Sequence, residues 1–129
     1  MRFAVPIARI LLGLLFTLTG LLGLYFEATL GAPPPPAMAG LAGQFMDLIF
    51  KSHYAVVVDI FQIAGGVMLL VNRYVMLGLV ILAAILVNIL TFHMTMNPEG
   101  IVLPLVAVAL WCVVAWSQRA KFALLFAPG

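Results

Sequence analysis

A set of amide, hydroxyl and imidazole side chains lies near one end of an otherwise apolar stretch of the chain. The set consists of Asn88, Thr91, His93, Thr95 and Asn97. Polar groups are costly in lipid, and a charged side chain at the centre of a membrane costs about 2.5–3.5 kcal/mol on insertion scales. Such a cluster inside an apolar segment therefore predicts a functional site.

A second polar group occurs in another apolar segment, where Asp59 and Gln62 are about one helical turn apart. A carboxylate in hydrocarbon should find a partner, take up a proton or meet water. We expect Asp59 to pair with His93 or with Lys51. The candidate ligand-binding residues are therefore Asp59, Gln62, Asn88 and His93.

Each of these residues also has a purely structural interpretation. Asn88 can bond across a helix pair, which contributes about 0.6 kcal/mol on average, and Thr91 and Thr95 are expected to bond the carbonyl groups that precede them. His93 can be an interface histidine near the lipid headgroups. Asn88 and His93 point about 140° apart on a helix, so one face cannot hold both.

Catalytic and metal chemistry have little support in the sequence. The chain has no His-x-x-x-His or Glu-x-x-His spacing, so no metal site is expected. Haem is not expected either, because it would require His53 and His93 to face each other. The single cysteine, Cys112, excludes an internal thiol–disulfide relay. No catalytic residue can be named.

The composition indicates a helical protein of the membrane. Hydrophobic residues make up 66% of the 129 residues and charged residues 8%, whereas a soluble domain is about half apolar and a quarter charged. Lipid must cover such a surface, and the alternation typical of barrel strands is absent. The net charge of +2 includes no basic run, so a nucleic-acid partner is not expected.

The apolar segments predict an all-α, polytopic membrane protein with a bundle of four transmembrane helices in a single domain. The spans are expected at about 3–26, 53–71, 74–96 and 101–117. A short amphipathic helix, expected at about 38–51, should lie along the membrane interface. Residues 27–39 read as an interruption that contains four consecutive prolines, interpreted as a rigid loop rather than a proline-recognition ligand. The first apolar run is longer than a typical signal core, so we expect an uncleaved span.

Glycines and cations add packing and orientation to this arrangement. Gly65 and Gly66 lie in the second span and allow a neighbouring helix to approach closely. Arg73 ends that span. With four spans, Arg73 lies on the same side of the membrane as both termini, together with Arg2, Arg9 and the cations near the C-terminus. The positive-inside rule then places the termini in the cytoplasm, with the bacterial inner membrane as the expected location.

The segments LLGLLFTLTGLLGLYFE, AGGVMLLVNRY and ILVNILTFH with the following NPEG turn resemble the DoxX family of small four-span membrane proteins. The resemblance extends over nearly the whole chain. It implies a four-helix bundle and, for some members, a role in membrane redox complexes, including thiosulfate:quinone oxidoreductase. Matched positions are Gly65, Gly66, Arg73, Asn88 and His93, whereas Gln62 stands where the family often has an acidic residue.

Two functional hypotheses follow from the residues and the resemblance. The first is a subunit of a larger, redox-linked membrane complex that contributes a site for a quinone or another hydrophobic small molecule. The second is a structural or assembly protein whose polar residues only hold helices together. Membrane lipid is the expected surrounding in both cases, and the partners are other membrane subunits or further copies of the chain.

Overall fold

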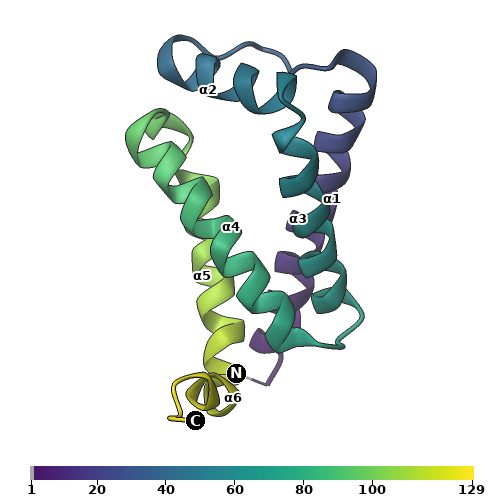
Figure 1. The fold of residues 1–129 in the computed structure, drawn as a ribbon. Coiled ribbons are helices and arrows are strands. Elements are labelled where there is room, and N and C mark those ends of the chain that lie inside the picture. Colours follow the sequence, from purple (N-terminus) through teal and green to yellow (C-terminus); the bar gives the residue numbers. More distant parts are fainter. Residues whose placement is uncertain (1) are drawn as a thin grey trace.

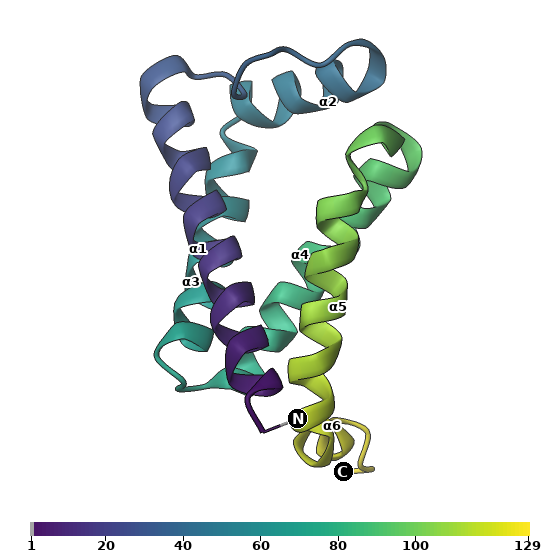
Figure 2. The same cartoon turned by 180° about the vertical axis from the view of Figure 1, so that it is seen from behind.

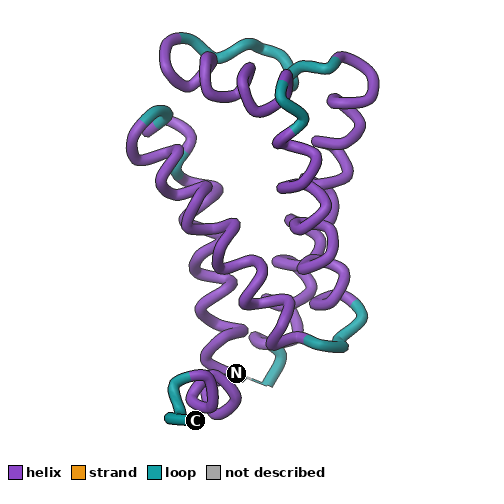
Figure 3. Tube along the Cα trace, in the orientation of Figure 1, coloured by secondary structure: helices purple, strands orange, loops and turns teal. Residues whose placement is uncertain are grey.

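The computed structural model describes residues 2–129, and all regular structure in that range is helical. The elements are α1 (Ala4–Leu30), α2 (Gly40–Lys51), α3 (Tyr54–Leu70), α4 (Val75–Thr95), the 3-10 turn η1 (Pro98–Gly100), α5 (Val102–Ser117) and α6 (Arg119–Leu125). Figure 1 shows their order along the chain, and Figure 3 shows how little of it is loop. The all-α class expected from the composition is confirmed.

The long helices form two pairs, α1 with α3 and α4 with α5. The pairs meet at the end that holds both termini and diverge toward the end that holds α2, as Figures 1 and 2 both show. The fully buried side chains Leu12, Leu69, Leu79, Leu82 and Val114 form the centre of the core. α2 lies across the open end.

Two helices, α1 and α4, are each long and apolar enough to cross a membrane. α3 and α5 reach that length only together with their bent neighbours, since α2 meets α3 at 85° and α6 meets α5 at 86°. The chain therefore has between two and four candidate spans. Many large apolar side chains of these helices are exposed, as expected for a surface covered by lipid.

Glycines set the distance between helices. A Cβ built on Gly66 would lie 2.8 Å from the carbonyl oxygen of Gly13, and one built on Gly78 would lie 3.0 Å from the carbonyl oxygen of Gly65. Gly65 and Gly66 thus face opposite neighbours, α4 and α1. Without a hydrophobic drive between helices in lipid, such close contact lets van der Waals packing contribute to helix association.

The first helix continues past the end expected from the sequence. The predicted interruption at 27–39 is wrong for its first four residues, because α1 includes Glu27 and ends at Leu30. The helix ends where Gly31 adopts φ 57°, and its amide donates to the carbonyl groups of Phe26 and Glu27.

The predicted helix at 38–51 is present as α2, which begins at Gly40. His53, with φ 61°, lies at the sharp bend between α2 and α3. Asp47 and Lys51, which have the spacing of a helical ion pair, do not form one; within residues 2–129 the only ion pair joins His53 to Glu27.

The two short connections expected around α4 are confirmed. α3 and α4 are joined by a tight turn in which Asn72 and Tyr74 have φ of 55° and 57°. After α4 the amide of Gly100 donates to the carbonyl oxygen of Asn97 over 3.2 Å, which closes the predicted turn.

Arg9 connects α1 with α3 near the termini, because its guanidinium donates to the carbonyl oxygen of Leu69.

Candidate functional site

The hydroxyl and amide groups of α4 bond to their own helix. The Asn88 amide donates to Ala84 O at 2.9 Å, and the Thr91 and Thr95 hydroxyls donate to the carbonyl oxygens four residues earlier at 2.8 and 2.7 Å. The prediction for the two threonines is confirmed. The expected bond from Asn88 across a helix pair is absent from the described residues. All three side chains are exposed, and they form a polar stripe on α4.

His93 lies on a different face of α4, as its spacing requires. Its Nδ1 is 2.9 Å from Ile89 O, and since a carbonyl can only accept, Nδ1 carries the hydrogen. The ring meets Phe92 edge-on, and a Cβ built on Gly100 would lie 3.1 Å from Nε2. His93 therefore packs under the η1 turn.

The expected pairing of Asp59 with His93 or Lys51 is wrong. Within residues 2–129 Asp59 forms no ion pair, and its Oδ2 is buried without a hydrogen-bond partner. The carboxylate points instead at α1, where a Cβ on Gly23 would lie 2.5 Å from Oδ1. The physical reason is the missing side chain of Gly23, which leaves room for the carboxylate between the two helices.

Gln62 also faces α1. Its Oε1 accepts a hydrogen bond from the Thr19 hydroxyl at 3.1 Å. The four candidate residues are thus divided: Asp59 and Gln62 lie at the α1–α3 interface, and Asn88 and His93 lie on α4. The structure does not join them into one site.

The sequence reasoning missed the contact of Glu27 with His53. His53 Nδ1 lies 2.5 Å from Glu27 Oε1, and the Glu27 side chain is only 8% exposed. Thr19, Gly23 and Glu27 recur every four residues and so share one face of a helix, a pattern that could have placed Glu27 inside the first helix but does not identify His53 as its partner.

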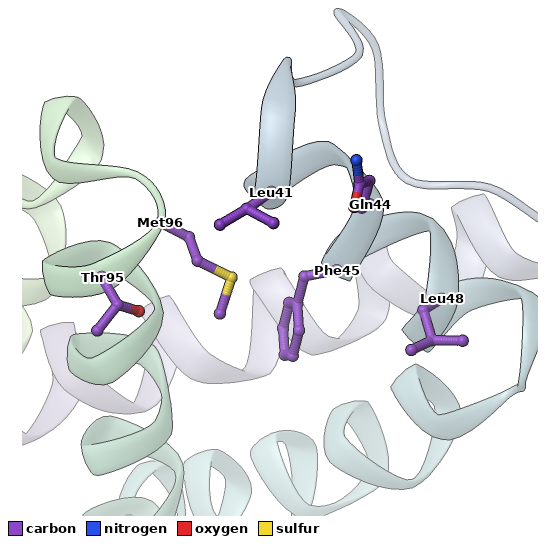
Figure 4. Close-up of a pocket in the computed structure, with 6 residues that line it drawn as sticks. All are labelled: Leu41, Gln44, Phe45, Leu48, Thr95 and Met96. Carbon is purple, nitrogen blue, oxygen red and sulfur yellow. The ribbon is translucent and has the colours of Figure 1, made fainter.

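An open apolar groove lies between α2 and α4. Its volume is about 490 Å³, and Figure 4 shows the side chains that line it. They are Leu41, Gln44, Phe45, Leu48, Thr95 and Met96. Phe45 also contacts the ring of Phe92 on α4, with ring centroids 5.4 Å apart, so this contact connects the two walls.

The groove combines an apolar lining with little polar surface. In Figure 4 the side chains of Leu41, Phe45 and Met96 approach one another from the two walls. The Thr95 hydroxyl already donates to Thr91 O, whereas within residues 2–129 no hydrogen bond occupies the amide of Gln44. A hydrophobic molecule with one acceptor group fits this lining.

No family model, curated protein or solved structure matches this chain.

Proposed function

We propose that this protein is a DoxX-like integral membrane subunit of a larger, redox-linked membrane complex, and that it binds a quinone or a similar hydrophobic small molecule in the groove between α2 and α4. The groove is the observation that carries the proposal. Its volume of about 490 Å³ falls within the range of roughly 300–1,000 Å³ that is usual for small-molecule sites.

The proposed binding mode follows from the lining. The flat ring of a quinone headgroup would lie between Phe45 and Met96, with its isoprenoid chain leaving through the open side toward lipid. In Figure 4 the Gln44 side chain points away from Phe45 and Met96, so its amide would donate to a quinone carbonyl oxygen after a change of rotamer.

The membrane arrangement we propose has four spans, with α3 and α5 as the two shorter ones and α2 along the interface. Both termini would be cytoplasmic and the membrane would be the bacterial inner membrane. Support comes from the cations. Arg2 and Arg9 lie at the start of the chain and of α1, Arg73 lies in the turn between α3 and α4, and Arg119 and Lys121 lie in α6. These segments are at the end of the molecule where the termini lie (Figure 1). Lys51 is at the end of α2.

Filling the groove should abolish binding. Met96→Trp places a large ring in the groove, and we expect it to weaken the binding of a short-chain ubiquinone at least about tenfold, which corresponds to about 1.4 kcal/mol. Binding would be measured by titration of the purified protein in detergent. Gln44→Leu should weaken binding less, by the loss of one hydrogen bond.

The matched control is Met94→Trp, because Met94 is exposed on the same helix and does not line the groove. It should bind the quinone as the wild type does. Asn88→Ala and His93→Ala should also leave binding unchanged, since neither residue lines the groove. Equal affinity of Met96→Trp and wild type for the quinone would refute the groove as the binding site. Loss of binding in His93→Ala would indicate instead that the quinone binds at the polar residues of α4.

The alternative function is a structural or assembly role without any ligand. The exposed polar stripe of Asn88, Thr91 and Thr95 favours it, because polar side chains in spans usually face protein rather than lipid. Asn88→Val should then lower the yield of the purified complex while the isolated protein keeps its stability. An unchanged yield of the complex in Asn88→Val would show that the polar stripe does not hold the complex together.

A further inference from the structure

The interface between α1 and α3 contains three polar contacts, at successive turns of α1, that are not part of the groove. Thr19 meets Gln62, Gly23 meets the carboxylate of Asp59, and Glu27 meets His53. The three α1 positions are four residues apart, so they lie on one face of the helix.

Asp59 is the least satisfied member of this set. It is 7% exposed, yet its Oδ2 has no hydrogen-bond partner. Within residues 2–129, no Lys or Arg nitrogen lies within 4.0 Å of its carboxylate oxygens. A buried charge without a partner is strongly unfavourable in an apolar setting. The Asp59 carboxylate therefore needs a positive charge or a hydrogen-bond donor that the neighbouring side chains do not supply.

Glu27 presents the same deficiency one turn away. Its Oε1 is bonded to His53, whereas its Oε2 is buried without a partner. Glu27 follows Gly23 by four residues, so the two backbone positions are roughly 6 Å apart along α1, and a helical side chain leans back toward the N-terminus, here toward Gly23 and the Asp59 carboxylate beside it. Two neighbouring negative charges in apolar surroundings repel each other, and a single added proton removes one of them.

A metal cation is a poorer match than a proton. Within the described residues no three His, Cys, Asp or Glu side chains converge as metal ligands would. The nearby Gln62 Oε1 already accepts from Thr19, and the surrounding carbonyl groups belong to helices. One proton needs only the two unpartnered oxygens.

We propose that Glu27 and Asp59 form a proton-binding site between α1 and α3, and that His53 connects this site with water. The His53 side chain is 77% exposed, with Nδ1 against Glu27. A proton bound at Nε2 lets Nδ1 pass its own proton to Glu27 Oε1, which leaves His53 neutral with its hydrogen on Nε2. Transfer from Glu27 to the unpartnered Asp59 Oδ2 then places the gained proton on the Glu27–Asp59 pair. The site gains one positive charge and no group is oxidised or reduced.

The other elements that pack against α3 bring no competing charge to this pair. α2 carries Asp47 and Lys51, which are both exposed and form no ion pair. The only titratable side chain within α4 is His93, which bonds to Ile89 O. The proposal is independent of the groove, because none of its three residues lines that groove.

Infrared titration of the whole protein in lipid nanodiscs tests the site. We expect a carbonyl band of a protonated carboxylic acid that rises as the pH falls and is lost completely in Asp59→Asn. Glu27→Gln should shift this band, because the partner oxygen changes. Glu99→Gln, which alters an exposed carboxylate in η1, should leave the band unchanged.

Several results would overturn the proposal. These are a band that keeps its amplitude in correctly folded Asp59→Asn, a band that keeps its position in correctly folded Glu27→Gln, and a band that depends on sodium at fixed pH, which would indicate a metal cation. Circular dichroism checks folding, and Glu27→Gln serves as the second variant if Asp59→Asn does not fold.

The role of His53 has its own kinetic test. After a rapid pH change, the band should form roughly tenfold more slowly in His53→Gln than in wild type, with the same final amplitude, because only the path to water is lost. Lys51→Gln, two residues earlier and equally exposed, is the matched control and should leave the rate unchanged. An unchanged rate in His53→Gln would exclude His53 as the connection.

Discussion

Replacing Gly66 by alanine is expected to lower the free energy of unfolding by roughly 1–3 kcal/mol. The added Cβ would lie 2.8 Å from the Gly13 carbonyl oxygen and 2.8 Å from the Thr17 amide nitrogen. These are backbone atoms of α1, so they cannot move aside without separating the two helices. Unfolding by SDS in mixed micelles, followed by circular dichroism, measures the change.

The matched control is the neighbouring residue. Gly65→Ala gains the same helix propensity, about 1 kcal/mol, in the same helix. Its Cβ meets the Leu82 side chain, with Cγ and Cδ2 both at 2.8 Å, whereas the backbone atom of α4 that it meets, the Gly78 carbonyl oxygen, is 3.3 Å away, so the two helix backbones clash less. Gly65→Ala should therefore cost clearly less than Gly66→Ala. The reverse order would contradict the packing of α1 on α3 described above.

These glycines show what the sequence could predict about the fold. Apolar length, the four-proline run and the turn residues place the helices and connections within a few residues, because they act locally. Which glycine faces which helix depends on how the helices are rotated. Gly65 and Gly66 are adjacent in sequence and yet contact α4 and α1.

The candidate site was less predictable than the helices. The local prediction for Thr91 and Thr95 succeeded because their bonds reach only one turn back along the same helix. The pairing of Asp59 failed because it depended on which helix lies beside α3. Lys51 and His93 were the expected partners, but the space left by Gly23 lets the carboxylate point toward α1.

The groove could not be predicted from the sequence at all. It exists because α2 lies at 85° to α3 and reaches toward the end of α4, where Phe45 meets Phe92. The amphipathic pattern of 38–51 predicted a helix along the membrane interface, but not that this helix would reach toward α4. That direction is set at Ser52 and His53, where His53 adopts φ 61°.

Trp111→Ala should be the most damaging change in the α4–α5 pair, with an expected cost of roughly 3 kcal/mol, the lower end of the range for tryptophan because Trp111 is half-buried. The Trp111 indole donates to Leu79 O at 2.9 Å and so ties α5 to α4. Its ring also meets Phe122 at a centroid distance of 5.9 Å and holds α6 against the bundle. One side chain therefore joins three helices. Unfolding in SDS measures the loss, and proteolysis within α6 reports its release.

Trp111→Phe and Trp116→Ala separate the contributions. Phenylalanine keeps most of the ring contact but loses the donor, so its cost should be near the 0.6 kcal/mol average for a hydrogen bond between spans. Trp116 is 71% exposed and loses mainly its contact with Arg119, which is worth about 0.5–1 kcal/mol. If Trp111→Ala cost no more than Trp116→Ala, Trp111 would not hold these helices together. If Trp111→Phe cost as much as Trp111→Ala, the single hydrogen bond would carry the contact and the ring packing would add nothing.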